Sequence, residues 1–442
     1  FQAEDGIRDV ERSRGLGDVY KRQMIYKIQF VKLFLSLLLI PLFVFGAEDN
    51  IYKEVDTIIE AAISDSAWPG AVLVVGNKDG IQYQKSYGFH TYEKKEKTRP
   101  DDIFDLASIT KVMATTPAVM DLYEKEKISL DDPIVKYIPE FTGSTETATL
   151  MKELVSIRHL LTHTSGLPAY KSFNYSEETP ESIMASILST DLDTLPGTRY
   201  VYSCLGFITL GEMVKRVSGF PLNEYVKKNI YTPLGMDHTC YLPPSDWMDR
   251  IVPTEYSEQE EGYIRGRVHD DIAAGLAGIS GNAGLFSTGK DMAVYAQMFL
   301  NKGTYKGITI FKPKTVELFT KRAYLLLDNS RCLGWDSPQG ESSAGVYAGP
   351  NSFGHTGYTG TSMWIDPDND LFVILLTNAV HPHRRYKYPN YFDWRQLVHS
   401  KVYEALDLTK ENPECVWKER WENPKVRNQY QEKTFWQKLF NR

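Results

Sequence analysis

The apolar positions at the start of the globular part of the chain predict a helix followed by a hairpin. Between residues 51 and 63, hydrophobic side chains recur at a spacing of three to four, which is typical of an amphipathic helix. A Trp-Pro-Gly breaker ends that pattern. A β-branched run at 71–76 and a return segment at 81–88 then flank an Asn-Lys-Asp-Gly turn, and together they predict a β-hairpin.

Strand patterns return only near the end of the chain. Segments 362–366 and 371–376 flank a Pro-Asp-Asn-Asp turn and predict a second hairpin, and a closing helix is expected near 394–405. The pattern in between, to about residue 288, is of helices and long loops. We therefore predict an α+β fold, an α/β sandwich. Its antiparallel sheet is flanked by N- and C-terminal helices, with an inserted, mostly helical domain at about 101–290.

The first 46 residues have the pattern of an export signal preceded by foreign sequence. Residues 1–23 are charged and lack apolar periodicity, and we interpret them as a non-native extension. Residues 24–46 combine an early basic stretch with an apolar run before Ala47, as signal peptides do. This interpretation predicts a periplasmic or extracellular protein with a folded domain at 47–410 and a tail at 411–442, in contact with a membrane only through an uncleaved signal segment. A native polar extension before a membrane anchor is the alternative.

Composition and charge narrow the possible partners. The 442 residues are 42% hydrophobic and 24% charged, which is typical of a globular protein with a sizeable core. The formal net charge is −7 and no long basic run occurs, so nucleic-acid binding is not expected. Four cysteines lack metal-type pairing and leave one disulfide possible outside the cytosol. His159 and His163 have no evident third ligand, so helix-end packing is preferred over zinc, and no metal or organic cofactor is implied.

Ser108-Ile109-Thr110-Lys111 lies in an apolar, helix-like stretch at 101–127. Residues at i and i+3 share one face of a helix, so Lys111 can reach the Ser108 hydroxyl. An adjacent amine can activate a serine if burial or a nearby cation lowers the pKa of that amine. The backbone N–H of a serine in the first helical turn is also available to an oxyanion. Pro117 is expected to kink this helix or to break one of its turns.

The same four-residue pattern occurs again at 287–290, so the pattern is weak on its own. There, Thr288 and Asp291 are typical of an N-cap with an acidic first turn, opening a helix at 292–296. We therefore assign the second copy a structural role. The first copy needs chemical partners elsewhere in the chain.

Two further motifs supply such partners. Tyr200-Val201-Tyr202-Ser203-Cys204 precedes an apolar helix, and Gly354-His355-Thr356-Gly357-Tyr358 precedes the second hairpin, where it is expected on an edge strand beside a cleft. In the order S-x-x-K, Y-x-(N), (K/H)-T-G, the chain resembles the serine β-lactamase and penicillin-binding-protein superfamily. It is most similar to the class C β-lactamase and family VIII esterase branch. The stretches 158–167 and 282–288 add to the resemblance, which covers 51–405 and implies a β-lactamase/transpeptidase-like fold.

The resemblance implies a role for each matching residue. Ser108 would be the acylated nucleophile, Lys111 would share or relay its proton, and Tyr202 would act as general base and later as proton donor to the leaving group. A phenol can act as a base when a nearby cation stabilises its anion, and Lys111 would be that cation. The backbone N–H groups of Ser108 and Tyr358 would form the oxyanion hole. Substrate contacts are implied for Cys204, His355, Thr356, Gly357 and Tyr358.

Two departures from the family pattern bear on the substrate. His355 replaces the usual lysine and carries only part of a positive charge near pH 7, which favours uncharged esters or amides. Cys204 replaces the usual asparagine, and a thiol binds a substrate amide weakly. The resemblance thus implies a serine hydrolase that forms an acyl-enzyme with small esters or peptidoglycan-derived D-amino-acid amides. A non-catalytic binding or sensing module is the alternative, against which the set Ser108, Lys111 and Tyr202 argues.

Overall fold

The computed structural model of the protein describes residues 50–323, 329–387 and 391–418. The expected extension at 1–23, the expected signal segment at 24–46 and most of the expected tail lie outside the described residues. Within the described residues, no helix combines the length and apolar character needed to cross a membrane.

Both predicted hairpins belong to one five-stranded antiparallel sheet, which confirms the predicted fold class. The strand order is β10-β11-β12-β1-β2. The strands are β1 Gly70–Asn77, β2 Gly80–Gly88, β10 Phe353–Thr356, β11 Ser362–Asp366 and β12 Leu371–Thr377. Ala71 of β1 pairs with Thr377 of β12, so the first and last strands of the domain lie side by side. β10 is an edge strand, as expected for the third motif.

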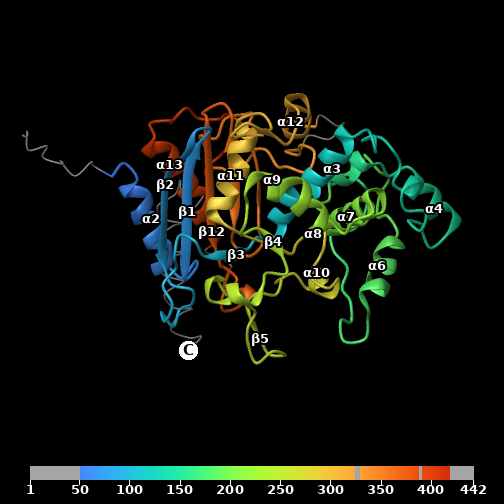
Figure 1. The fold of residues 1–442 in the computed structure, drawn as a ribbon, viewed down its shortest axis with the longest axis horizontal. Helices are drawn as coiled ribbons and strands as arrows, with labels where there is room; N and C mark the ends of the chain where they lie inside the picture. The colour runs from blue at the N-terminus through green and yellow to red at the C-terminus, as the bar shows by residue number, and fades with distance from the viewer. Residues whose placement is uncertain (1–49, 324–328, 388–390, 419–442) are drawn as a thin grey trace, which may run out of the picture. The chain divides into compact units, whose positions relative to one another are not determined.

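The sheet is buried on both faces, and successive side chains of β1 point into two different hydrophobic cores. Val72 and Val74 belong to the core shared with the helical middle, whereas Leu73 and Val75 belong to the core on the opposite face. The helices α2 (Lys53–Ser64) and α13 (Tyr391–Ala405) cover that opposite face, and α11 (Gly289–Leu300) packs on the other (Figure 1). Burial on two faces explains why β1 reads as a continuous apolar run.

The middle of the chain is largely helical, as predicted. Its helices are α3 Thr116–Glu124, α4 Glu146–Glu153, α5 Ile157–Leu161, α6 Pro180–Leu188, α7 Cys204–Ser218, α8 Leu222–Val226, α9 Thr232–Leu234, α10 Asp271–Gly275 and, later in the chain, α12 Pro313–Thr320. A small sheet was not predicted: it has the order β3-β7-β4, from Ile103–Asp105, Leu285–Thr288 and Cys240–Tyr241. Two-stranded ribbons join β5 (Tyr256–Ser257) to β6 (Gly262–Tyr263) and β8 (Thr304–Tyr305) to β9 (Ile308–Thr309).

Pro117 breaks the helix that carries the first Ser/Lys pair, as predicted. The segment splits into a 3₁₀ turn at 107–109, a π turn at 111–115 and α3. Proline has no N–H, so the carbonyl of Met113 loses its helical donor. That carbonyl instead accepts a hydrogen bond of 3.0 Å from the Tyr231 hydroxyl, and the carbonyl of Val112 accepts one of 2.7 Å from Tyr295. Two core tyrosines thus support the wide turn that begins at Lys111.

The second copy of the Ser/Lys pattern caps a helix, as predicted. The side chain of Thr288 accepts a hydrogen bond of 3.2 Å from the backbone N–H of Asp291 at the start of α11. The Ser287 hydroxyl lies 2.7 Å from the Thr239 hydroxyl. Ser287 is therefore a structural serine, and Lys290 is exposed.

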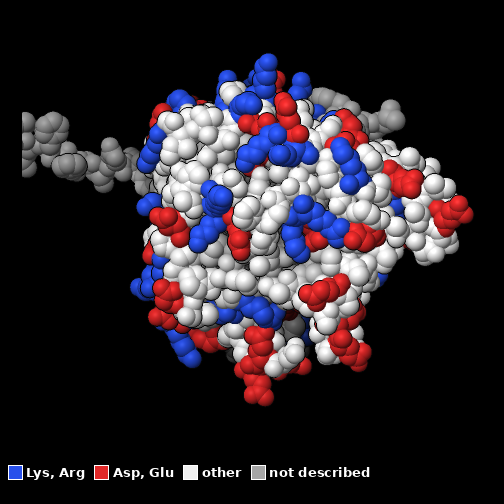
Figure 2. Space-filling model, turned by 45° about the vertical axis from the view of Figure 1, so that its right-hand side comes forward, with Lys and Arg blue, Asp and Glu red and all other residues white. Residues whose placement is uncertain are grey.

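Charge on the molecular surface is mixed. Figure 2 shows Lys and Arg side chains interspersed with Asp and Glu over the face that it draws. The absence of a nucleic-acid partner stays a prediction. The four cysteines, Cys204, Cys240, Cys332 and Cys415, are not joined in disulfides.

A buried histidine behind the sheet leads to a prediction about acid stability. Nε2 of His399 in α13 lies 2.9 Å from the Ser362 hydroxyl of β11, and burial together with nearby Arg395 lowers the pKa of His399 to about 3. Unfolded histidine titrates near pH 6.5, so the unfolded chain binds the extra proton between these values. The stability that neutral His399 contributes is therefore fully present above about pH 6.5 and is lost as the pH falls toward 3.

We expect the free energy of unfolding of the wild type to fall by about 2 kcal/mol between pH 7 and pH 5, because His399 takes up a proton only in the unfolded chain. In His399→Gln that part of the loss should be absent, although the variant starts from a lower stability at pH 7. Urea unfolding at the two pH values measures the difference. His238→Gln, at a half-buried position, is the control. Equal losses in the wild type and in His399→Gln would contradict the assignment.

Candidate active site

Ser108 lies at the start of the broken helix, in a strained and tightly held turn. Ala107 before it has φ of 47°, a left-handed conformation that is uncommon for residues other than glycine. One carboxylate oxygen of Asp105 stabilises this turn by accepting a hydrogen bond of 2.8 Å from the N–H of Ala107. The other oxygen accepts a hydrogen bond of 2.7 Å from the N–H of His269. Ser108 is partly exposed, whereas its neighbours are buried. The turn thus presents one hydroxyl to the outside of a packed core.

Lys111 is fully buried and contacts the Ser108 hydroxyl. Its Nζ lies 3.0 Å from Ser108 Oγ and 3.8 Å from Sγ of Cys204. It also donates a hydrogen bond of 3.0 Å to the carbonyl of Asn282. Burial by itself lowers the pKa of Lys111, but the interactions with Cys204 and Tyr202 outweigh burial, and the pKa lies above its ordinary value. Lys111 is therefore an ammonium ion at neutral pH. The sequence-based condition for Lys111 as the base, a lowered pKa, is not met.

Tyr202 packs against two cations. Its ring centroid is 5.1 Å from Nζ of Lys111 and 5.3 Å from Cζ of Arg331. Because Lys111 already carries its proton, Tyr202 is the remaining candidate in these motifs for the group that accepts the proton of Ser108.

The third motif joins the backbone just before Ser108. The N–H of Gly357 donates a hydrogen bond of 2.7 Å to the carbonyl of Thr361, and the Thr361 hydroxyl donates one of 3.2 Å to the carbonyl of Leu106. The Thr359 hydroxyl donates 2.7 Å to the carbonyl of Asp105. A side chain at Gly357 would meet the Leu106 oxygen at 2.5 Å, so only glycine permits this approach. The backbone at Gly357 therefore lies against Leu106, two residues before Ser108.

The side chains of the third motif differ in their roles. His355 and Thr356 end the edge strand β10, and His355 is buried with its Nδ1 2.8 Å from the carbonyl of Thr356. Burial, with the cations Arg331 and Lys111, holds the pKa of His355 well below its ordinary value. His355 is thus neutral and does not replace a lysine as a cation. The ring of Tyr358 is partly exposed and stacks on His269 at a centroid distance of 6.0 Å.

Arg331 is the cation that the sequence patterns missed. Its Nε donates 3.1 Å to the Tyr200 hydroxyl, and Nη2 lies 3.4 Å from the carboxylate of Asp336. Its Nη1 is buried and has no hydrogen-bond partner within the described residues. No motif marks Arg331, because a tertiary contact alone brings it to Tyr202. Asn282 was missed differently: it lies in a stretch that contributes to the resemblance, but its carbonyl had no assigned role.

The histidines His159 and His163 act as hydrogen-bond acceptors for backbone groups. Nδ1 of His159 accepts 3.2 Å from the N–H of Ser156, and Nδ1 of His163 accepts 3.0 Å from the N–H of Ser203. Across the part of the chain that the structure describes, no group of three His, Cys, Asp or Glu residues is placed to hold a metal ion.

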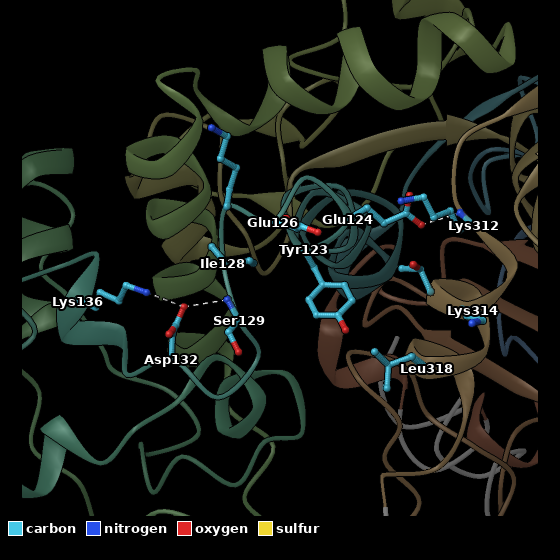
Figure 3. Close-up of a pocket in the computed structure, with 12 residues that line it drawn as sticks. Tyr123, Glu124, Glu126, Ile128, Ser129, Asp132, Lys136, Lys312, Lys314 and Leu318 are labelled. Atoms are coloured by element: carbon cyan, nitrogen blue, oxygen red, sulfur yellow. Dashed lines mark hydrogen bonds and ion pairs between the residues drawn. The ribbon is translucent and has the colours of Figure 1, made fainter.

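A surface pocket of about 580 Å³ lies elsewhere on the molecule (Figure 3). It lies between the residues that follow α3 and the start of α12, and Tyr123, Asp132 and Lys312 are among the residues that line it. Asp132 is already satisfied by Lys136 at 3.0 Å and by the N–H of Ser129 at 2.8 Å. The pocket contains none of the residues of the Ser108 site.

Solved structures with the same fold include hydrolases and penicillin-binding-protein homologues. "EstCE1, a hydrolase with promiscuous acyltransferase activity" is 21% identical, with a TM-score of 0.62 over 79% of this chain and 98% of that chain. A penicillin-binding protein homologue from Caulobacter crescentus is 17% identical, with a TM-score of 0.64 over 80% and 98%. These likenesses confirm the β-lactamase/transpeptidase-like fold.

Proteins related in sequence point to the same family as the fold. A protein of Bacillus subtilis (strain 168) named "N-acetylmuramyl-L-alanine amidase" is 33% identical over 80% of this chain and 89% of the relative. A protein of Escherichia coli (strain K12) named "Putative D-alanyl-D-alanine carboxypeptidase" is 33% identical over 77% and 88%. The profile of the family described as Beta-lactamase matches residues 55–397. Together with the site around Ser108, this match shows that the chain belongs to the beta-lactamase family, a family of serine hydrolases.

Proposed function

We propose that the protein is an exported serine hydrolase that forms an acyl-enzyme with small esters or with cell-wall-type D-amino-acid amides. The observation that carries the proposal is the contact of 3.0 Å between Nζ of Lys111 and Oγ of Ser108, next to Tyr202. A binding module needs no serine hydroxyl whose lysine partner also packs on a tyrosine ring. The basic and apolar pattern at 24–46 supports export.

In the proposed reaction, Tyr202 acts as the general base that takes the proton of Ser108 as Oγ bonds to the substrate carbonyl carbon. The ammonium of Lys111 stabilises the charge on both oxygens, and the backbone N–H groups at Ser108 and Tyr358 stabilise the oxyanion. Tyr202 then gives its proton to the leaving alcohol or amine as the bond to that group breaks. Water attacks the acyl-enzyme by the same steps, which releases the acid and restores Ser108.

A buried arginine favours substrates that end in a carboxylate. The guanidinium of Arg331 is buried and packs on Tyr202. Since His355 is neutral, the positive charge of Arg331 acts through space and supports recognition of a terminal D-amino acid beside the scissile amide. The names of the Escherichia coli and Bacillus subtilis relatives are consistent with peptidoglycan-derived substrates.

The experiment that tests the proposal combines labelling with turnover. The purified protein is treated with a fluorophosphonate probe and assayed with p-nitrophenyl butyrate and with an acetylated peptide ending in D-Ala-D-Ala. We expect an adduct on Ser108 and release of D-alanine from the peptide. Ester turnover without peptide turnover would restrict the enzyme to esters. An unlabelled protein that turns over neither substrate would overturn the proposal in favour of a binding module.

Replacing Arg331 tests recognition of the carboxylate separately. In Arg331→Met, kcat/KM for the D-Ala-D-Ala peptide should fall about 10- to 100-fold more than kcat/KM for the neutral ester, because the attraction between a cation and a carboxylate several ångströms apart contributes roughly 2 kcal/mol at a protein site. The ratio matters, since loss of a cation beside Tyr202 slows both reactions. Arg322→Met, which removes an ion pair with Glu414, is the matched control. Equal losses for both substrates would exclude Arg331 from carboxylate binding.

A further inference from the structure

His163 holds the segment of Tyr202 from both sides. It has a left-handed backbone with φ of 58°, a conformation that is uncommon for residues other than glycine and that histidine, asparagine and aspartate adopt more often than the rest. Its carbonyl accepts 2.9 Å from the N–H of Val201, and its ring Nδ1 accepts 3.0 Å from the N–H of Ser203. Its ring also lies against the Tyr202 ring, with centroids 4.4 Å apart and planes at 36°. One residue thus contacts the backbone on each side of Tyr202 and the ring itself.

The hydrogen bonds of two histidines near Tyr202 determine where their protons lie. Because Nδ1 of His163 accepts a backbone N–H, its proton is on Nε2. Nδ1 of His355 faces the carbonyl of Thr356, which can only accept, so the proton of His355 is on Nδ1 and its Nε2 carries a lone pair. Burial, with Arg331 and Lys111, holds the pKa of both rings well below the ordinary value, so both are neutral.

Three buried polar atoms near Tyr202 lack partners within the described residues. They are two donors, Nε2–H of His163 and Nη1 of Arg331, and one acceptor, Nε2 of His355. All three residues lie near the Tyr202 ring: its centroid is 6.0 Å from that of His355, and His163 and Arg331 both pack on it. Buried polar groups almost always have partners, and where no protein group reaches them the partner is water. A water molecule can accept two hydrogen bonds and donate to a lone pair.

We propose that His163 is the positioning residue of Tyr202, and that one buried water molecule joins Nε2–H of His163, Nη1 of Arg331 and Nε2 of His355. This inference deepens the proposed function and rests on it. His163 does not touch the reacting atoms: it sets the place of the phenol through Val201, Ser203 and ring contact. The water links that position to the cation and to the third motif.

The test compares substitutions of His163 that keep or lose the acceptor for Ser203. In His163→Asn the amide oxygen can take the place of Nδ1, and asparagine tolerates the left-handed backbone. In His163→Gln the acceptor lies one bond further out. We expect kcat to fall about 100-fold in His163→Gln, as for a catalytic group displaced by about 1 Å, with KM nearly unchanged, and to be largely recovered in His163→Asn.

His159→Gln is the matched control, because His159 accepts a backbone N–H from Ser156 in the same way but belongs to the cap of α5. Equal effects of the two glutamine variants on kcat, or a loss in His163→Gln that appears in KM alone, would overturn the positioning role. If His163→Gln does not fold, the recovery of kcat in His163→Asn relative to His163→Ala decides the question.

A measurement independent of turnover separates this inference from the proposed function. With ¹³C at the ζ position of tyrosine, the Tyr202 signal is assigned with Tyr202→Phe and should move in His163→Gln but not in His159→Gln. The ¹⁵N signals of the imidazoles should show protons on Nε2 of His163 and Nδ1 of His355, with an NOE from the former to water. An inactive wild type would overturn only the proposed function. An unmoved Tyr202 signal would overturn the positioning role, and an absent NOE would overturn the shared water.

Discussion

Replacing Ser108 by alanine is expected to lower kcat about 10⁴-fold or more for every substrate of the enzyme, whereas Ser287→Ala is expected to leave kcat unchanged. Both serines begin an S-x-x-K pattern, but only one has its lysine placed to act on it. Ser108 Oγ lies 3.0 Å from Nζ of Lys111, while Ser287 Oγ lies 2.7 Å from the Thr239 hydroxyl in a buried structural contact. Removal of the nucleophile leaves only the binding and oxyanion contributions.

The measurement is turnover of p-nitrophenyl butyrate by the wild type and both variants, with mass spectrometry of the fluorophosphonate adduct. Loss of both turnover and adduct in Ser108→Ala alone is the expected result. Activity that survives in Ser108→Ala would mean that another group is the nucleophile. The partly exposed thiol of Cys204, 3.8 Å from Lys111, would then be examined by alkylation.

Lys111→Met is expected to lower kcat about 10³-fold or more, and Lys290→Met to have no effect on kcat. Methionine has a similar length and suits the buried position, so the change removes the ammonium from a site that remains packed. Without Lys111, Ser108 loses its hydrogen-bond partner and Tyr202 loses one of the two cations that pack against its ring. Lys290 is exposed and follows the N-cap of α11.

Thermal unfolding of both methionine variants must accompany the kinetics, because loss of Lys111 also leaves the carbonyl of Asn282 without its donor. A folded Lys111→Met protein that retains acylation by the fluorophosphonate at the wild-type rate would contradict the role of the ammonium.

Local patterns were sufficient to predict the main sheet and its surroundings. Both hairpins combine short apolar runs with turn residues, and the helix break at Pro117 follows from its missing N–H. The small sheet could not be found in this way. Its strand β4 has only two residues, Cys240 and Tyr241, which is too short for any periodicity, and it exists because β7 offers it a partner.

Some residues of the site could likewise be predicted from local sequence, whereas others are placed there only by tertiary packing. The pair Ser108 and Lys111 is local in sequence, and the fold brings the residues of the other two motifs around it. Arg331 could not be predicted, because its neighbours in sequence form no pattern and its place beside Tyr202 depends on packing over a long separation. The raised pKa of Lys111 could not be predicted from the sequence either. It results from burial, which lowers the pKa, and from the interactions with Cys204 and Tyr202, which raise it by more.

The pairing of β1 with β12 has a consequence for the order in which the enzyme is made. The ribosome releases β1 early, but its central neighbour, from Leu371 to Thr377, emerges only when the domain is nearly complete. The backbone at 357–358, which we propose as part of the oxyanion hole, also comes late, long after Ser108. A growing chain therefore contains a nucleophile without a site, and contacts so distant in sequence close slowly. Translation must pass the last strand before any acyl transfer can begin, so chains that stop early are expected to be inert rather than partly active.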